Sequence, residues 1–319
     1  MRHLAIPLLW LSGIALAACS AQDEAQPRLV ERTCPPLPEQ KWAWVPGGEV
    51  TIGADARLPE EGPARTVTVA GFWMATHEVT NAEFAAFVRA TGYRTMAERP
   101  PPVLPGAPPE MHQPGSAVFT VPTADQPSWW RWVVGAQWRL PEGPEGGFGG
   151  RGDIAGKDRD PVVQIAYEDA LAYARWAGKA LPTEAQWEAA ARAGGADPRE
   201  PVAADGSPQA NYYQGAFPAR DLGLDGFQGR APVACYPANR LGIFDMIGNV
   251  WEWTGDPADP ASADPESGSH VIKGGSYLCA ANYCARYRPA ARQFQERGLG
   301  TDHIGIRLID PDRPPPSAG

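Results

Sequence analysis

Three short helical patterns separated by long loops constrain the fold of this chain most strongly. Two of them begin with a capping box, Thr80 to Glu83 and Thr183 to Gln186, and the third covers residues 167–177. Alternating apolar residues predict strands within 42–53, around a Pro-Gly-Gly turn, and over 66–72. No strand–helix–strand rhythm links these elements, so the pattern predicts a single α+β domain with low regular secondary structure and with function on loops.

The helices each carry one apolar face that we expect to lie in the core. These residues are Phe84, Phe87, Val88, Leu171, Ala174, Trp187, Ala190 and Ala191. Glycines at positions 92 and 194 predict the ends of the first and the last helix.

A Pro- and Gly-rich segment, residues 97–152, contains Trp129, Trp130, Trp132 and Trp138. A solvated linker would not carry four tryptophans, because disordered segments are poor in aromatic residues. We therefore predict an ordered excursion that packs on the domain. The formal net charge of −9 gives no support to nucleic-acid binding, which favours basic surfaces.

The N-terminus has the features of a targeting segment. Arg2 and His3 precede an apolar run over residues 4–18, which is too short to span a membrane and is typical of a signal peptide. The run ends in Leu-Ala-Ala-Cys, which looks like a bacterial lipoprotein cleavage site with Cys19 as the lipidated residue. The alternative is ordinary cleavage nearby, with Cys19 incidental.

These features divide the chain into a lipoprotein signal peptide (1–18), a polar tether (19–40), one domain (41–310) and a Pro-rich, frayed tail (311–319). The expected location is the bacterial cell envelope, with the domain anchored through the lipid on Cys19 and facing the periplasm. Ser20, which follows the cysteine, suggests the outer membrane rather than the inner one, by resemblance to other lipoproteins. We expect a monomer.

Two of the five cysteines, Cys279 and Cys284, are separated by only four residues in a Tyr- and Arg-rich segment. Such a pair can close a small loop as a structural disulfide, cycle between dithiol and disulfide, or hold a soft metal ion such as Cu(I). If Cys19 is lipidated, Cys34 and Cys235 remain, either as a disulfide that joins the tether to the domain or as two unpaired thiols.

The segment around the pair resembles the active-site stretch of the formylglycine-generating enzymes, the sulfatase-modifying oxidases. In that family the two cysteines lie between a G-G-S-[YF] motif and an R-Y-R motif, here residues 274–277 and 286–288. Other motifs match in the family's order: WRLPEGP at 138–144, WAGKALPTEAQWEAAARAG at 176–194, ANYYQG at 210–215, DGFQGRAPV at 225–233, GNVWEWT at 248–254 and GIR at 305–307. The resemblance covers most of residues 41–309.

This resemblance implies that the chain has the family's fold, which is distantly like C-type lectins. It also implies that the chain is a copper-dependent oxidase. Cu(I) bound by Cys279 and Cys284 would activate O2 and convert the cysteine of a Cys-x-Pro-x-Arg motif in a sulfatase to Cα-formylglycine. Ser276 and Trp251 match residues that line the family's oxygen and substrate pocket. The alternative is that the Ser276 hydroxyl only supports a turn and the Trp251 indole only packs in the core. The chain departs from the family at Ala280, where His is frequent, and at Ala281, where a polar residue is frequent.

The resemblance also implies two structural calcium sites. The first would use Asn211, Tyr212, Asp225 and Phe227, with carbonyl oxygens from Tyr212 and Phe227. The second would use Asp245, Gly248, Val250 and Glu252, with Asp245 in place of a family Asn. Calcium prefers six to eight oxygen ligands of these types.

Two other functions remain open at this stage. The chain could be an oxidase that acts on another exported peptide or on a siderophore precursor. It could also be a non-catalytic envelope lipoprotein that uses the fold for binding, although relatives of that kind lack the cysteine pair. The sequence has no G-x-G-x-x-G motif that follows a strand and opens a helix, so it does not indicate a dinucleotide as the redox cofactor.

Overall fold

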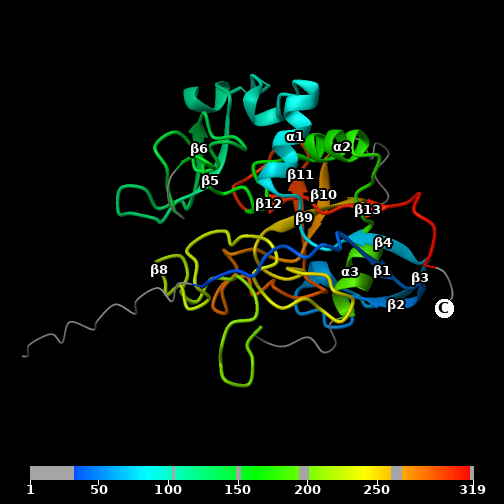
Figure 1. Cartoon of the computed structure of the whole chain (residues 1–319). Coiled ribbons are helices and arrows are strands. Elements are labelled where there is room, and N and C mark those ends of the chain that lie inside the picture. The colour runs from blue at the N-terminus through cyan, green and yellow to red at the C-terminus, as the bar shows by residue number, and fades with distance from the viewer. Residues whose placement is uncertain (1–31, 103–104, 149–151, 194–200, 260–267, 317–319) are drawn as a thin grey trace, which may run out of the picture.

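Two small sheets and three helices form the domain in the computed structural model, which describes residues 32–102, 105–148, 152–193, 201–259 and 268–316 (Figure 1). One sheet has the strand order β11-β10-β9-β12 and the other the order β1-β4-β13. Three further strand pairs, β2-β3, β5-β6 and β7-β8, are two-stranded. The prediction of an α+β domain with low regular secondary structure is confirmed.

The strands are short and are spread over the whole described part of the chain. Their bounds are β1 Trp42–Val45, β2 Gly48–Ile52, β3 Arg65–Val69, β4 Phe72–Ala75, β5 Gly115–Phe119, β6 Trp130–Val134, β7 Gly215–Ala216, β8 Arg220–Asp221, β9 Trp251–Pro257, β10 Ser269–Lys273, β11 Arg292–Glu296, β12 Ile304–Gly305 and β13 Ile309–Asp310. The helices are α1 Asn81–Thr91, α2 Tyr167–Trp176 and α3 Glu184–Arg192, with short 3-10 turns η1 Pro59–Glu61, η2 Met96–Glu98 and η3 Pro109–His112.

The predicted strands exist, but one boundary differs from the prediction. β1 and β2 flank the Pro-Gly-Gly turn without pairing to each other, since β1 pairs with β4 and β2 with β3. The strand predicted over 66–72 ends at Val69, and Phe72 begins β4. Ala70 and Gly71 separate the two strands, and the inward-facing positions change phase there, from Val67 and Val69 to Phe72 and Met74.

The capping boxes form as predicted. Thr80 Oγ1 accepts from Glu83 N at 3.3 Å, and Glu83 Oε2 accepts from Thr80 N at 3.0 Å. Gly92 follows α1 in the left-handed conformation, at φ 67°, where a residue without Cβ is favoured. The Thr183–Gln186 box caps α3 in the same way, and α3 ends at Arg192; the predicted stop at Gly194 lies outside the described residues.

The predicted helix faces are buried, except that Leu171 is only partly covered. α1 and α2 lie side by side above the β9–β12 sheet (Figure 1), and their aromatic rings pack with Phe84 stacked on Tyr173 at 5.6 Å between ring centroids. α3 packs between the β2–β3 hairpin and strands β9 and β10. The helices and the strands that they contact therefore form the packed core to which the long loops connect.

The described parts of the excursion, 97–102 and 105–148, pack on the domain, as predicted, and contain the β5–β6 hairpin at its side (Figure 1). Three buried hydrogen-bonding groups join it to the body: Ser116 Oγ donates to Gly300 O at 2.6 Å, Phe119 N donates to Asp302 Oδ2 at 3.0 Å, and Gln164 Nε2 donates to Pro141 O at 2.7 Å. The hairpin is thus held against the segment that precedes β12.

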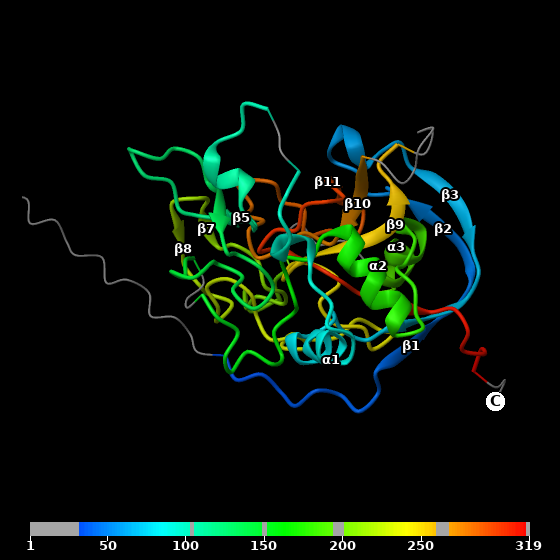
Figure 2. The same cartoon turned by 90° about the horizontal axis from the view of Figure 1, so that it is seen from above.

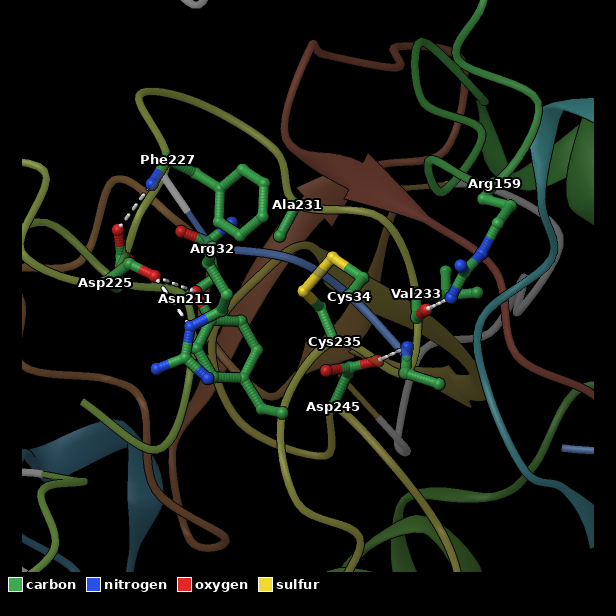
Figure 3. The surroundings of a disulfide bond; sticks show 12 residues. Arg32, Cys34, Arg159, Asn211, Asp225, Phe227, Ala231, Val233, Cys235 and Asp245 are labelled. Carbon is green, nitrogen blue, oxygen red and sulfur yellow. Dashed lines mark hydrogen bonds between the residues drawn. A yellow bond between two sulfur atoms is a disulfide. The ribbon is translucent and has the colours of Figure 1, made fainter. Parts of the chain in front are cut away.

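The N-terminal strap, residues 32–41, runs along one edge of the domain (Figure 2) and is joined to it by a disulfide between Cys34 and Cys235. Arg32 donates to the carbonyl oxygens of Asp225 and Pro208, each at 3.1 Å, and its guanidinium lies 4.5 Å from the ring centroid of Tyr236. Figure 3 shows this disulfide beside Asp225 and Asp245. Of the two alternatives, the disulfide is therefore the correct one.

The tail packs on the domain as far as Pro314, whereas the sequence predicted that it is frayed from residue 311. Arg313 lies over the Trp73 ring at 4.1 Å, and Trp73 Nε1 donates to Pro314 O at 2.8 Å. The apolar run 4–18 and Cys19 lie outside the described residues. Among the residues that are described, no helix is both long and apolar enough to cross a membrane.

Removing the disulfide should destabilise the domain substantially, because it closes a loop of 201 residues in the unfolded chain. We expect the Cys34→Ser/Cys235→Ser variant to lose about 2–4 kcal/mol of unfolding free energy in urea titrations. The wild-type protein should lose a similar amount on reduction, whereas the variant should not respond to reductant. Equal stability of the two proteins under oxidising conditions would contradict this expectation.

Candidate active site

Cys279 and Cys284 lie on a tight turn that brings their sulfur atoms together. Cys279 N donates to Ser276 O at 2.9 Å, and Cys279 O accepts from Tyr213 N at 3.0 Å, so the first cysteine is fixed by backbone pairing. Cys284 has a left-handed backbone, with φ 72°. The two sulfurs are 2.9 Å apart, well beyond the roughly 2.05 Å of a disulfide, so both are free thiols.

The two thiols lie in different environments. Cys279 is 2% exposed and Cys284 is partly exposed. A hydrogen bond from Cys279 and the Arg286 guanidinium lower the pKa of Cys284 to about 7, against the opposing effect of burial. Burial, together with the bond to Cys284, raises the pKa of Cys279 well above its usual value. Cys284 is therefore the more readily ionised sulfur.

Arg286 is positioned by an ion pair. Its NH1 lies 3.5 Å from Cys284 Sγ, and its NH2 lies 2.5 Å from Glu60 Oε1 on the η1 turn. Arg286 belongs to the R-Y-R motif, but nothing in the sequence pointed to Glu60, which is 226 residues away. The ion pair with Glu60 therefore holds the positively charged Arg286 guanidinium next to Cys284, the more exposed of the two sulfurs.

A cleft opens in front of the cysteine pair, and both predicted pocket residues line it. Ser276 and Trp251 are buried in its wall, next to the two cysteines. Ser276 Oγ also accepts from Leu278 N at 3.2 Å, so it supports the turn as well. The structure thus brings together the four residues that the sequence predicted, while their catalytic roles stay predictions.

His303 also lines the cleft and was missed by the sequence analysis. Its Nδ1 lies 2.6 Å from Thr301 Oγ1, and its ring packs on Trp130 at 4.9 Å between centroids. Burial lowers the pKa of His303 to about 3, so the imidazole is neutral at physiological pH. The only sequence signal was its position two residues before the GIR motif.

An aromatic group forms the mouth of the cleft. Tyr283 is 44% exposed and stacks on Phe217 at 4.4 Å between centroids, and Trp129 packs edge-on against both rings. Ala280 is buried and forms backbone bridges with Tyr213 and Cys284, while Ala281 is exposed. Neither alanine lines the cleft, so these two departures from the family pattern leave its walls unchanged.

The residues of the first predicted calcium site converge in part. Asp225 Oδ2 accepts from Tyr212 N at 3.1 Å, and Asp225 Oδ1 accepts from Phe227 N at 3.0 Å. The Gln214 amide nitrogen bridges Asp225 Oδ2 and the Tyr212 carbonyl oxygen. Asn211 instead donates its amide to Gly229 O and Asn249 Oδ1. A carboxylate and a carbonyl oxygen thus face one polar position, which suits a cation.

At the second predicted site, Asp245 and Glu252 share a buried region with Glu78, which the sequence analysis missed. Burial raises the pKa of Glu78 well above its usual value, and the charges of Asp245 and Glu252 add to the effect. Glu78 Oε2 has no hydrogen-bond partner among the described residues. Arg307 lies within 3.7 Å of Glu78 and 2.7 Å of Glu252.

The buried carboxyl groups of Glu78, Asp245 and Glu252 are oxygen ligands of the type that Ca2+ prefers. Gly248 and Val250 lie in the loop between the two predicted carboxylate ligands. Within the described ranges, however, no three His, Cys, Asp or Glu side chains gather closely enough to form a metal site by themselves. Backbone and amide oxygens would have to complete either coordination shell, so both calcium sites stay predictions.

The chain matches a known family over most of its length. The model of the "Sulfatase-modifying factor enzyme 1-like domain" matches residues 27–311. The formylglycine-generating enzyme of Mycobacterium tuberculosis is 47% identical over 83% of this chain and 96% of its own length. The mouse formylglycine-generating enzyme is 40% identical over 85% of this chain and 75% of its own length.

The fold is shared with a solved structure as well. PvdO from Pseudomonas aeruginosa superposes with a TM-score of 0.56 at 23% identity, over 84% of this chain and 93% of its own. At this identity the similarity supports the fold alone.

Proposed function

This chain belongs to the sulfatase-modifying factor enzyme family, and on that basis we propose that it is a formylglycine-generating oxidase. Its substrate would be the cysteine of a Cys-x-Pro-x-Arg motif in a sulfatase, which it would convert to Cα-formylglycine with O2. Curated formylglycine-generating enzymes at 40–47% identity support this assignment.

The observation that carries the proposal is the free cysteine pair at the wall of the cleft. The two sulfurs are 2.9 Å apart and unoxidised, although the Cys34–Cys235 pair forms a disulfide in the same structure. Two facing thiols, one of them readily ionised, are the donor set that Cu(I) prefers. Copper bound by Cys279 and Cys284 would supply the activation of O2, which reacts slowly with an unactivated cysteine.

The protein's own residues prepare the cleft for a thiol substrate. Arg286, held by Glu60, favours the thiolate form of Cys284. Trp251, the neutral His303 and Trp130 line the cleft beside the two cysteines, and His303 packs on Trp130. The Phe217–Tyr283 stack at the mouth offers a flat surface for an extended peptide.

The overall reaction needs a reductant. Conversion of the substrate's thiol-bearing methylene to an aldehyde with release of hydrogen sulfide removes two electrons, whereas full reduction of O2 to water takes four. The other two electrons would come from external thiols, which also keep Cys279 and Cys284 from closing as a disulfide.

A peptide assay tests the proposal. We expect the reduced, copper-loaded protein to convert a Cys-x-Pro-x-Arg peptide to formylglycine, with consumption of O2 and a mass change in the peptide. A peptide with Ala in place of Cys is the negative control, and the M. tuberculosis relative is the positive control. If only the relative converts the peptide, the sulfatase-activating assignment is wrong, and a different substrate or a binding role replaces it.

Calcium should stabilise the fold if the two predicted sites are real. Asp225 lies at one site and Asp245 and Glu252 at the other, and all three carboxylates are buried. We expect chelation to lower the melting temperature by several degrees relative to millimolar calcium, because a ligand that binds only the folded state stabilises it by mass action. Asp225→Asn and Glu252→Gln should each reduce the calcium response. Identical melting in chelator and in calcium would rule out both sites.

We also propose that the mature protein is a lipoprotein of the cell envelope, anchored through Cys19. The sequence boundary at the end of the apolar run supports this. Mass spectrometry of the membrane fraction would detect the acylated N-terminus, and a soluble form without acyl mass would contradict the anchor.

A further inference from the structure

A second pocket, the strap pocket, lies where the N-terminal strap meets helices α1 and α2. It encloses about 610 Å³, part of which is open to solvent, and pockets that bind small molecules measure roughly 300–1,000 Å³. The strap pocket and the cysteine cleft share no lining residue, so the proposed oxidation does not use it. Its walls include Lys41, Trp42, His77, Glu83, Tyr173 and Leu308.

His77 presents a hydrogen-bond acceptor to this pocket. The side chain is 7% exposed, and its Nδ1 lies 2.7 Å from the carbonyl oxygen of Glu78. A carbonyl oxygen can only accept, so Nδ1 carries the proton and Nε2 is the acceptor of the neutral ring. Burial lowers the pKa of His77, which favours this neutral form. Within the described part of the chain, Nε2 has no hydrogen-bond donor.

Tyr173 of α2 presents a hydrogen-bond donor to the same pocket. The residue is 6% exposed, and its ring packs on Phe84 and Phe87 with centroids 5.6 Å apart in both contacts. Burial raises the pKa of Tyr173, so the hydroxyl keeps its proton. No other residue that the structure describes accepts this proton. Because a buried polar group without a partner is costly, an acceptor bound in the pocket would satisfy it.

The pocket also has one charge of each sign that is open to a ligand. Lys41 is exposed at the end of the strap and forms no ion pair with an acid among the described residues. Glu83 caps α1 through Oε2, which accepts from Thr80 N and Thr80 Oγ1 at 3.0 Å each, while Oε1 takes no part in the cap. The charge of the second lysine in the wall, Lys179, is already balanced by Asp310 at 2.9 Å.

We propose that the strap pocket binds a free amino acid with an apolar side chain. Lys41 and Tyr173 donate to its carboxylate. Glu83 and His77 accept from its ammonium group, and its side chain lies against Trp42. The inference does not depend on the proposed oxidation, since the two sites have separate walls.

Both charges of the ligand are needed to satisfy the pocket. A simple carboxylic acid would leave Glu83 and His77 without a donor. A simple amine would leave Lys41 and Tyr173 without an acceptor. An α-amino acid carries both groups on one carbon atom, so it can occupy all four positions while its apolar part leaves water.

Calorimetric titration with L-leucine tests the inference. The comparison ligands are 3-methylbutylamine, which lacks the carboxylate, and 4-methylpentanoate, which lacks the ammonium group. We expect L-leucine to bind at least about tenfold more tightly than either one, because each analogue loses hydrogen bonds to charged groups. Absence of binding at millimolar L-leucine would overturn the inference. An analogue that binds as tightly as L-leucine would also overturn it, because one charge would then be enough.

Two substitutions locate the binding in this pocket. Tyr173→Phe removes only a hydroxyl, so the fold should be kept and L-leucine should bind about tenfold more weakly. Glu83→Gln should weaken binding by a similar factor, and glutamine can serve in a capping box, so α1 keeps its cap. Melting temperatures check that both variants fold.

Glu49→Gln is the matched control, because Glu49 is an exposed acid on β2 outside the pocket. It should bind L-leucine as the wild type does. Wild-type affinity in folded Tyr173→Phe and Glu83→Gln would place the amino acid elsewhere and overturn the inference.

Discussion

Cys279→Ser should abolish both copper binding and peptide conversion. Changes in groups that only orient a metal ligand typically cost 10- to 100-fold in affinity, so loss of one of two ligands should cost more than about 100-fold. Cys279 is the buried member of the pair, and serine keeps its size and hydrogen-bonding capacity. The loss should therefore come from the sulfur rather than from altered packing.

Competition with a Cu(I) chelator measures the affinity directly, and conversion of the Cys-x-Pro-x-Arg peptide measures the activity. The Cys34→Ser/Cys235→Ser variant is the matched control, because it removes sulfur atoms from a pair that lies outside the cleft. It should bind Cu(I) with wild-type affinity once folded. If Cys279→Ser also binds copper as the wild type does, these cysteines are not the ligands.

Arg307→Met should destabilise the protein strongly. The guanidinium is fully buried, donates to Glu252 Oε1 and Oε2 at 2.7–3.0 Å, and also donates to the carbonyl oxygens of Ala75 and Phe244. Without it, Glu78, Asp245 and Glu252 would form a buried cluster of carboxylates that lacks its central cation. Removing one partner of a buried ion pair costs about 3–5 kcal/mol.

Urea unfolding in the presence of chelator would measure this loss without interference from bound cations. Arg65→Met makes the same substitution at a residue that is 57% exposed and lies 3.7 Å from Glu184. Because such surface pairs contribute only about 0–1 kcal/mol, Arg65→Met should be nearly neutral. A change below about 1 kcal/mol in Arg307→Met would show that the buried carboxylates do not need this cation.

The position of Arg307 gives a physical reason for the GIR motif. In the sequence, these residues were only a matching triplet near the C-terminus. In the structure, the glycine belongs to β12, which pairs with β9, and the arginine that follows neutralises a glutamate on β9. The motif is therefore explained by burial and charge balance.

Features with local causes could be predicted from the sequence. The capping boxes at Thr80 and Thr183 formed as predicted, because each is complete within four residues. The cysteine pair could also be identified, since a turn of six residues brings both sulfurs together. The resemblance to formylglycine-generating enzymes depended on such short motifs, and the family match confirms it.

Features that join distant segments could not be predicted from the sequence, because they depend on how the chain packs. β1 and β2 are adjacent in sequence but pair with other strands, because burial of their side chains selects partners that no local pattern encodes. Glu60 reaches Arg286 across 226 residues, and His303, in the turn before β12, packs on Trp130 of β6. The walls of the cleft therefore follow from long-range packing, which single-sequence patterns do not contain.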